Sequence, residues 1–483
     1  MQMRVVQRVV GILLSLFSAT LITPFIIGLL YRDPPNSITP FIGAFFLTLT
    51  IGLCLFLPVR NHVGQLRLRD GFVVVVLFWA VLGIFGGLPF YLYSPLDLSI
   101  AAAIFESMSG LTTTGATVIV GLDRLPKCIL FYRQQMQWLG GMGIIVLAIA
   151  ILPILGIGGQ QLYRAESPGI SKDKLTPRIA GTAKALWYIY LGLTIACMLA
   201  YWAAGMTLFD AVAHSFSTVA IGGFSTHDNS IGYFDSALIE MIAVVFMLIS
   251  GVNFALHFTV ARKFDFRHYW NDEEFRTYLF IAVTLTLIVS SYLYLTETSE
   301  LSESVRHGLF HVVSIGTTTG FTSQEYFNWP GFLPILLLFA SFAGGCAGST
   351  GGGMKVIRVL LLYKQGQREL RRMLHPYANI VVKVGKQTMS NRMIDVVWGF
   401  FAAYLALLGI MLLILMALGV DQESAFSAVA ACLNNLGPGL GIVAANYSSL
   451  DDLSLSVLSM AMLFGRLEIF TLLILFTPSF WRQ

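Results

Sequence analysis

Four short segments of this sequence carry residue types that bind a dehydrated cation through backbone oxygen atoms. Aligned on their last glycine, they read SMSGLTTTG (107–115), SFSTVAIGG (215–223), VVSIGTTTG (312–320) and VAACLNNLG (429–437). Glycine adopts positive φ, which lets an extended strand aim successive carbonyl groups to one side. Rings of such carbonyls replace the hydration shell of K⁺ in potassium filters. We therefore predict a K⁺-binding filter made of these residues: Thr113, Thr114, Gly115, Ile221, Gly222, Gly223, Thr318, Thr319, Gly320, Asn435, Leu436 and Gly437.

The four segments recur at a regular spacing and in the same context. Their last glycines lie 108, 97 and 117 positions apart. Each follows a residue that can cap a helix N-terminus, in chain order Asp97, Thr207, Ser302 and Asp421. The distance from cap to glycine accommodates a half-helix of about three turns and a short strand. One Thr-Thr-Gly is equally typical of close helix packing, but four copies in register favour a filter.

A second run of glycines interrupts the hydrophobic stretch 331–363. Residues 344–353 contain six glycines, and each would cost a helix about 1 kcal/mol relative to alanine. A glycine-rich helix-packing face is the alternative, but the length of the run and its two adjacent hydroxyls favour an unwound loop. If the loop projects beneath the filter, it forms a gate that Lys355 closes on the cytoplasmic side. The predicted gate residues are Gly344, Gly345, Gly348, Ser349, Thr350, Gly351, Gly352, Gly353, Lys355 and Arg466.

Arg466 and Glu468 lie inside the last hydrophobic stretch. A charge at the centre of a bilayer costs at least about 2.5–3.5 kcal/mol, so each requires a partner or a role. The two are poor partners for one another because residues two apart do not share a helix face. Two interpretations of Arg466 stay open: an electrostatic barrier that faces the pore below the filter, or a structural clamp on buried carbonyl groups.

Five further polar residues lie in apolar surroundings. We expect His214, His257 and His311 to be hydrogen-bonded packing residues, since each is isolated in the sequence. Arg133 is predicted to anchor pore-helix carbonyls, and Glu106 is predicted to bond the filter backbone from behind.

These segments are embedded in a very apolar chain of 483 residues. Hydrophobic residues make up 56% of it and charged residues 12%, whereas a soluble domain carries about 25% charged residues. The mean hydropathy is +0.75. A helix that crosses a bilayer needs roughly 20 apolar residues. We predict ten such spans, at 8–31, 38–59, 71–93, 128–157, 182–206, 236–260, 276–296, 331–363, 394–419 and 453–479.

The basic residues predict the orientation of the chain. With ten spans, six clusters that hold 24 of the 30 lysines and arginines fall on one side. The positive-inside rule makes that side cytoplasmic and places both termini there. The opposite loops are acidic, and acidic vestibules concentrate cations. The longest cytoplasmic connection, 355–392, is basic enough to bind anionic lipid or an acidic partner.

Each filter segment lies between two spans of the same orientation, which predicts an all-α polytopic membrane protein with ten transmembrane helices and four re-entrant pore half-helices. The four span–pore-helix–span repeats are parallel and therefore have pseudo-fourfold symmetry around one pore, unlike the inverted repeats of many secondary transporters. The predicted units are a two-helix N-terminal preface at 1–70, pore repeat 1 at 71–181, pore repeat 2 at 182–275, pore repeat 3 with the gate loop and basic linker at 276–392, and pore repeat 4 at 393–483.

Other functional classes find less support in the residues. The five cysteines lack the spacing of a metal or redox site, and we find no catalytic constellation, so the chain is not expected to be an enzyme. No nucleotide-binding fold or organic cofactor site is visible, so any dependence on ATP or NAD must come from a partner. A secondary active symporter coupled to H⁺ or Na⁺ remains the alternative to passive, gated flow.

The sequence resembles the Trk/Ktr/HKT superfamily of potassium transporters over essentially its whole length, and within it the bacterial Trk type. The resemblance rests on GLTTTGA (110–116), IGGFSTH (221–227), GGCAGSTGGGMK (344–355), NNLGPG (434–439), FGRLE (464–468) and the two-helix preface. In a plant-type sodium-transporting relative, serine replaces the first filter glycine. Gly115 is glycine here, which favours K⁺. The departures at Ile221-Gly222-Gly223 and Asn435-Leu436-Gly437 make the filter asymmetric.

The resemblance implies several properties that composition and spacing do not. It implies a single-chain pore for K⁺ in the bacterial inner membrane, a homodimer, and a cytoplasmic ring of separate regulatory subunits that bind NAD or ATP. On this resemblance, the ion bound by the filter residues is the transported K⁺. The basic connection 355–392 is, on this resemblance, a docking site for the regulatory ring.

Overall fold

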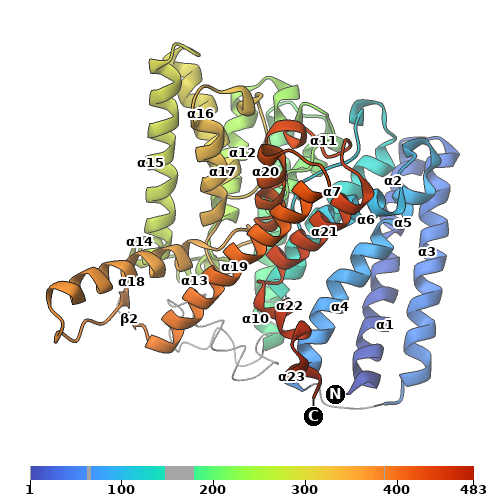
Figure 1. Ribbon diagram of the computed structural model, residues 1–483. Coiled ribbons are helices and arrows are strands. Elements are labelled where there is room, and N and C mark those ends of the chain that lie inside the picture. The colour runs from blue at the N-terminus through green and yellow to red at the C-terminus, as the bar shows by residue number, and fades with distance from the viewer. Residues whose placement is uncertain (1, 63–66, 147–178, 386, 483) are drawn as a thin grey trace.

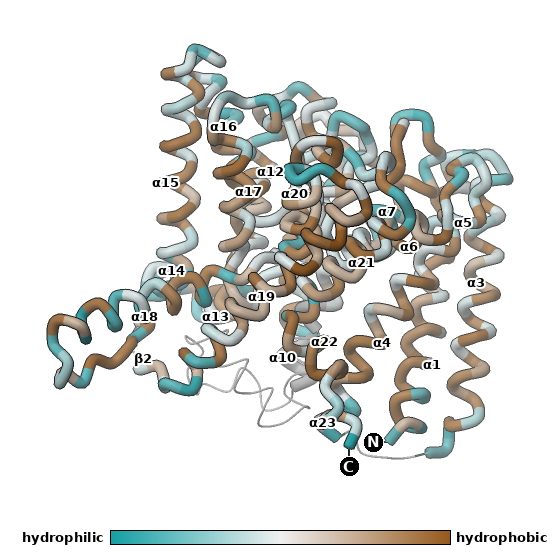
Figure 2. The backbone as a smooth tube through the Cα atoms, viewed as in Figure 1, coloured by the Kyte–Doolittle hydropathy of each residue, from teal (hydrophilic) through white to brown (hydrophobic). Residues whose placement is uncertain are grey.

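The computed structural model describes residues 2–62, 67–146, 179–385 and 387–482. Its regular structure is helical apart from one antiparallel pair of short strands, β1 (Lys383–Val384) and β2 (Gln387–Thr388). The long helices stand side by side between two ends of the molecule (Figure 1). Figure 2 shows hydrophobic residues along these helices and hydrophilic residues mainly in the connections at the two ends. This distribution is that of a membrane protein.

The first half of the chain contains a helical preface, followed by long helices with shorter helices between them. Its elements are α1 (Met3–Thr20), α2 (Ile22–Leu30), α3 (Pro35–Phe56), α4 (Leu68–Gly86), α5 (Leu88–Leu92), α6 (Ile100–Leu111), α7 (Lys127–Val146), α10 (Ile179–Ala203), α11 (Leu208–Ala220), α12 (Ala237–Ser250) and α13 (Phe254–Lys263). Single 3-10 turns cover Leu57–Val59, Ser94–Leu96, Leu122–Arg124 and Ser230–Phe234.

The second half repeats the alternation of long and short helices. Its elements are α14 (Arg267–Asn271), α15 (Glu273–Leu295), α16 (Leu301–Gly316), α17 (Leu333–Ala343), α18 (Val356–Leu374), α19 (Asn391–Ala417), α20 (Gln422–Leu433), α21 (Asp452–Arg466), α22 (Phe470–Leu473) and α23 (Pro478–Trp481). Single 3-10 turns cover Tyr326–Asn328, Gly441–Val443 and Ile474–Phe476.

The helix pattern is compatible with ten spans. In the described ranges, six helices are long and apolar enough to cross a membrane, or up to eight if each bent pair is one span. Two predicted spans are not straight: 236–260 bends by 92° between α12 and α13, and 453–479 bends by 108° between α21 and α22. The predicted span 331–363 is divided into α17 and α18, and 128–157 extends from α7 into residues outside the described ranges.

The four short helices α6, α11, α16 and α20 occupy the predicted half-helix positions. Thr207 and Asp421 are N-caps as predicted, and each side chain accepts a hydrogen bond from a backbone amide of the first turn. The other two predicted caps are wrong. α6 begins after Ser99, whose hydroxyl accepts from the amide of Ala102, and α16 begins after Glu300. Helix ends shift by such a few residues because several neighbouring polar side chains compete for the cap position.

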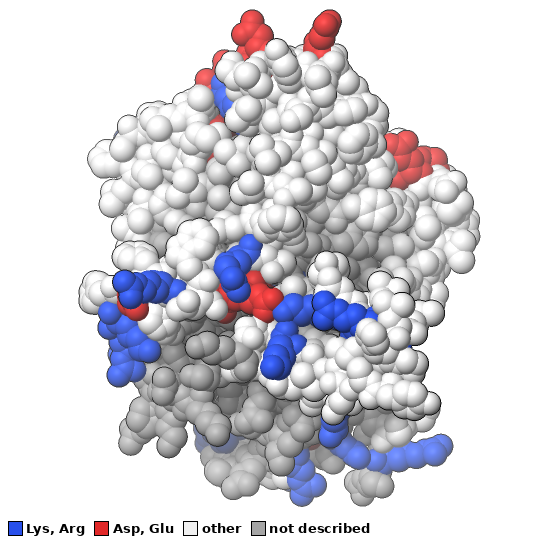
Figure 3. Space-filling view, turned by 90° about the vertical axis from the view of Figure 1, so that its left-hand side faces the viewer, with Lys and Arg blue, Asp and Glu red and all other residues white. Residues whose placement is uncertain are grey.

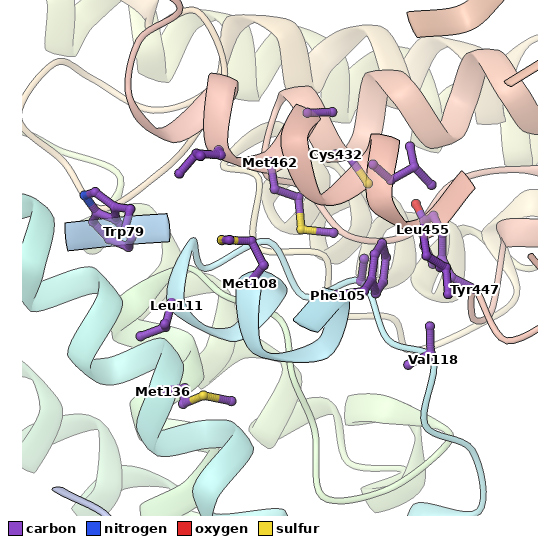
Figure 4. Close-up of a cluster of buried hydrophobic side chains, with 14 of the residues drawn as sticks. Trp79, Phe105, Met108, Leu111, Val118, Met136, Cys432, Tyr447, Leu455 and Met462 are labelled. Atoms are coloured by element: carbon purple, nitrogen blue, oxygen red, sulfur yellow. The ribbon is translucent and has the colours of Figure 1, made fainter. Parts of the chain in front are cut away.

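A buried hydrophobic cluster holds α6 in place. Figure 4 shows Phe105 and Met108 of α6 among side chains from α4, α7 and the C-terminal quarter of the chain, including Trp79, Met136 and Met462. Trp79 is 1% exposed and Met136 and Met462 are fully buried. Because segments hundreds of residues apart share this cluster, the position of the first filter segment depends on the fourth repeat.

The charged residues are divided between the two ends of the molecule. In Figure 3, Asp and Glu lie mostly at the upper end of the visible face, and most Lys and Arg lie in its lower half. The N- and C-terminal ends both lie at the lower end in Figure 1. The part of the basic cluster 164–184 that precedes residue 179 lies outside the described residues.

Candidate functional site

All four short helices end in the same backbone turn. The first member of each predicted ligand triplet has a positive φ although none of them is glycine: 53° at Thr113, 53° at Ile221, 69° at Thr318 and 54° at Asn435. The third member is the glycine, with φ of 86° at Gly115, 79° at Gly223, 83° at Gly320 and 101° at Gly437. Left-handed backbone costs a non-glycine residue roughly 1–2 kcal/mol, so the surrounding structure must hold these residues in place.

Identical backbone hydrogen bonds hold the four turns. The amide of the middle triplet residue donates to the carbonyl five residues earlier, as follows: Thr114 to Ser109 at 2.8 Å, Gly222 to Ser217 at 2.8 Å, Thr319 to Ser314 at 2.7 Å and Leu436 to Ala431 at 2.8 Å. These bonds satisfy carbonyl groups that a helix C-terminus otherwise leaves unpaired. Apart from the carbonyls of Gly222 and Gly437, which side chains bind, the carbonyls of the triplets are then available to a ligand.

The four strands contact one another in a closed cyclic order. A Cβ atom at Gly115 would collide with the carbonyl oxygen of Gly222, one at Gly223 with that of Thr319, and one at Gly320 with that of Leu436. A Cβ at Gly437 would lie 2.7 Å from the carbonyl oxygen of Thr114, which closes the ring. The structure thus brings all twelve predicted filter residues together. Gly115, Gly223 and Gly320 keep partial solvent exposure.

Two carbonyls of the ring are also hydrogen-bonded by side chains that the sequence analysis missed. Gln137 of α7 donates through Nε2 to the carbonyl of Gly222 at 2.5 Å and accepts from the amide of Phe224 at 3.1 Å. The Tyr447 hydroxyl donates to the carbonyl of Gly437 at 2.8 Å. Both carbonyls belong to the repeats that depart from the threonine pattern. The available signal was the amide-rich run Gln134–Gln137 inside a predicted span.

The asparagine of the fourth repeat ties that repeat to the first. Asn435 donates through Nδ2 to the Thr114 hydroxyl and to the carbonyl of Met462, both at 3.0 Å. In the first repeat, by contrast, Thr112 and Thr114 share a hydrogen bond of 2.7 Å within the segment itself. The departure from threonine is therefore matched by a different contact.

A buried ion pair lies behind the first two strands. Arg133 Nε and Glu106 Oε1 are 2.8 Å apart, and the two side chains are 1% and 0% exposed. Glu106 accepts from the amide of Val118 at 3.0 Å, three residues after Gly115, so it bonds the backbone that follows the filter rather than the filter backbone itself as predicted. Arg133 donates to the carbonyl of Ser225 at 3.0 Å. It anchors the strand after the second filter segment, not a pore-helix carbonyl as predicted.

We expect Arg133→Met to lower the free energy of unfolding by about 3–5 kcal/mol, because removal of one partner leaves a buried charge uncompensated. Thermal unfolding of the purified protein in detergent measures this change. The double variant Arg133→Met/Glu106→Gln should recover part of the loss, because it removes the orphaned charge. A double variant as unstable as the sum of the single variants would contradict the pairing.

The glycine-rich loop between α17 and α18 lies directly against the filter strands. The amide of Gly352 donates to the hydroxyl of Thr318 at 2.7 Å, and the amide of Gly353 donates to the carbonyl of Asn434 at 2.9 Å. The Thr350 hydroxyl donates to the carbonyl of Val219 at 3.0 Å. The predicted break in the span is confirmed, since α17 ends before Gly344. The loop contacts segments of the second, third and fourth repeats.

Charged side chains fasten the loop from several directions. Arg466 donates through Nη1 and Nη2 to the single carbonyl of Thr350, at 3.2 and 3.3 Å. The Lys355 ammonium donates to the carbonyl of Gly351. Glu274, at the start of α15, accepts from the amides of Ala347 at 2.6 Å and Ile357 at 3.2 Å. The sequence analysis missed Glu274, which no local pattern distinguishes from an ordinary first-turn acid.

Glu468 is confirmed as a poor partner for Arg466. It pairs with Arg358 of α18 at 2.8 Å, and the Arg358 guanidinium also stacks 4.0 Å from the centre of the Phe400 ring. Each charge near the bend between α21 and α22 therefore has a separate contact: Arg466 with the loop, and Glu468 with the helix that follows the loop.

The three isolated histidines are hydrogen-bonded, as predicted. His214 is bonded to the carbonyl of Asp210 and to the hydroxyl of Ser225, each at 2.9 Å. Both ring nitrogens of His257 and of His311 also have partners.

Comparison with known proteins gives a consistent family assignment. The profile of the family described as TrkH, cation transport protein, matches residues 37–483. The chain is 59% identical to the Trk system potassium uptake protein TrkH of Vibrio parahaemolyticus and 54% identical to that of Escherichia coli K12, with 100% of each chain covered. It is 41% identical to the Trk system potassium uptake protein TrkG of Escherichia coli K12, with 99% of each chain covered.

A solved structure supports the same assignment. The crystal structure of the potassium transporter TrkH from Vibrio parahaemolyticus matches this fold with a TM-score of 0.92 at 56% identity, over 100% of both chains. The fold described above is therefore the fold of that structure.

Proposed function

The chain belongs to the TrkH family of cation transport proteins, and we propose that it takes up potassium across the bacterial inner membrane through a channel-like selectivity filter. The observation that carries this proposal is the closed ring of four filter strands, in which the last glycine of each strand lies against a carbonyl oxygen of the next strand in the ring. Four parallel span–half-helix–span repeats with pseudo-fourfold symmetry build this ring, and both termini lie in the cytoplasm.

The half-helices supply the electrostatics of cation selection. α6, α11, α16 and α20 each end where a filter strand begins. A helix C-terminus carries about half a negative charge, so four of them around one axis favour a cation and repel an anion. The carbonyls of the strands take over the coordination that water gives the ion in solution. The ligand of the filter is the transported K⁺ itself, and the proposed transport uses no organic cofactor in this chain.

The loop 344–353 is the gate on the cytoplasmic side of this filter. Its contacts with Thr318, Asn434 and Val219 support this assignment, because they join the loop to residues at three of the four filter segments. Arg466 holds the loop closed through the carbonyl of Thr350. Both earlier interpretations of Arg466 are then compatible: the guanidinium clamps the loop through Thr350, and its positive charge repels a cation until the loop moves.

The chain acts as a homodimer with a cytoplasmic ring of nucleotide-binding subunits. The helix α18 directly follows the gate and projects from the body of the protein beside the hairpin β1–β2 (Figure 1). The contacts of Glu274 with Ala347 and Ile357 connect the loop and α18. A regulatory subunit that binds the open arrangement more tightly than the closed one shifts the gate by that difference in affinity.

The purified protein in a planar bilayer with K⁺ on one side and Na⁺ on the other tests this proposal. Discrete K⁺-selective openings are expected, with a reversal potential that follows the K⁺ gradient. A symporter coupled to H⁺ or Na⁺, the alternative function, gives saturable flux without discrete openings and moves its driving ion with K⁺. That result would replace the channel proposal.

A further inference from the structure

A histidine outside the filter connects its first two segments at the acidic end of the molecule. His227 follows Gly223 by four residues, and its ring lies flat on Tyr233, with ring centres 3.4 Å apart and planes 4° from parallel. Its Nδ1 atom is 2.5 Å from Asp123 Oδ1, in the connection after the first filter strand. Its Nε2 atom is 3.5 Å from Asp210 Oδ1, on the second pore helix.

This geometry favours a protonated ring. A neutral imidazole has one N–H group and can donate to one carboxylate, whereas an imidazolium donates through both nitrogens. Both nitrogens of His227 face carboxylate oxygens, and the side chain is only 9% exposed. Burial alone lowers the pKa of His227, but the hydrogen bonds and charges of Asp210 and Asp123 outweigh it and raise the pKa above its ordinary value of 6.5.

The other charged or titratable groups around the ring fit the same state. Asp228 accepts from the amide of Gly121 at 3.0 Å, so the loops of the two repeats are bonded to each other beside the histidine. Burial alone raises the pKa of Asp123, but the hydrogen bond and charge of His227 and the hydrogen bonds of Asp228 together outweigh it and lower that pKa, which keeps the carboxylate ionised. The His214 ring lies nearly parallel to that of His227, with centres 6.4 Å apart, and the Tyr233 ring stacks on His227.

The residues between Gly223 and His227 are bonded along their whole length. The Thr226 hydroxyl donates to Asp210 Oδ1 at 2.7 Å, and the Ser225 hydroxyl is bonded to His214 and to the amide of His227. The carbonyl of Ser225 accepts from Arg133. A shift of His227 therefore acts on the outer end of the second filter strand.

We propose that protonated His227 is a positioning residue that holds the outer ends of the first and second filter segments in register, and that loss of its proton to the outer solution lowers selectivity for K⁺ over Na⁺. This inference rests on the proposed filter function. After deprotonation, one of the two carboxylates faces a nitrogen lone pair, so the contact becomes repulsive and the two segments separate. Selectivity is complete below the pKa of His227 and falls as the outer pH rises through it.

Reversal potentials in a planar bilayer, with the outer pH varied at constant inner pH, test the inference. We expect the K⁺/Na⁺ permeability ratio of the wild type to be constant at low pH and to fall along an alkaline limb. Asp123→Asn removes one of the two carboxylates and should move that limb roughly one pH unit lower, as the loss of a neighbouring charge does. His227→Gln should give the alkaline wild-type ratio at every pH.

The matched control is His307→Gln, because His307, on the third pore helix, has its Nδ1 atom 3.9 Å from one carboxylate, that of Glu240, and 3.2 Å from the Ser323 hydroxyl, rather than between two carboxylates. It should leave the limb in place. Thermal unfolding checks that each variant is folded. Asp123→Asn depends least on this check, because the Asp123 side chain is 44% exposed.

The two proposals fail separately in this experiment. A wild type without K⁺-selective current overturns the proposed function. A K⁺-selective wild type that has no alkaline limb, or whose limb is unmoved in both Asp123→Asn and His227→Gln, overturns the role of His227 and leaves the filter intact.

Discussion

Gly115→Ser should lower the preference for K⁺ over Na⁺ about tenfold or more. Gly115 has a φ of 86°, a region that costs a residue with a Cβ roughly 1–2 kcal/mol, and 1.4 kcal/mol is a factor of ten. The new Cβ would also collide with the carbonyl oxygen of Gly222, so the second strand must move as well. Reversal potentials with K⁺ and Na⁺ on opposite sides measure the change. The same result is expected at Gly223, Gly320 and Gly437.

Variants at two other glycines serve as controls that separate the effect of backbone strain from that of a steric collision. Gly121 also has a positive φ, 73°, but a Cβ there meets no atom within 4 Å, so Gly121→Ser tests backbone strain without a collision. Gly316, at the end of the third pore helix, has open space and no positive φ. Both variants should retain K⁺ preference. Normal selectivity in all four filter variants, with normal expression, would refute the filter assignment.

Arg466→Ala should raise basal K⁺ flux and make it less dependent on a regulatory subunit. Hydrogen bonds from a charged donor contribute about 1.5–3 kcal/mol, so loss of the contact with Thr350 favours the open loop by roughly 10- to 100-fold. Deletion of part of 344–353 should have the same effect, because the loop is the obstacle itself. Flux into liposomes, with and without the regulatory ring, measures both variants.

Arg466→Lys distinguishes the clamp from the electrostatic barrier. Lysine keeps the charge but lacks the planar fork that places two N–H groups on one carbonyl. If charge repulsion dominates, the lysine variant conducts like the wild type. If the clamp dominates, it conducts like Arg466→Ala. Wild-type flux in both the alanine variant and the loop deletion, or simple unfolding of the alanine variant, would contradict the gate.

Residue types alone predicted the features that depend on local chemistry. Long apolar stretches predict helices because a bilayer leaves the backbone no other partner for its hydrogen bonds. The glycines at 115, 223, 320 and 437 indicated four turns of positive φ, which the structure has, because glycine tolerates positive φ without strain. The six glycines of 344–353 likewise predicted where α17 ends. Each of these conclusions needs only a residue and its neighbours in the chain.

Tertiary structure decided which distant groups meet, and it also overrode local preference. Thr113 and Ile221 adopt a conformation that their side chains disfavour, because strands from other repeats hold them. The partner of Arg466 is a carbonyl 116 residues away, and Glu468 pairs with Arg358 across 110 residues. Every residue has a backbone carbonyl, so residue type does not predict which carbonyl a charged side chain will bind. The glycines of the predicted filter were therefore visible in the sequence, whereas the contacts that hold the proposed filter and gate in place arise only when the four segments come together in the fold.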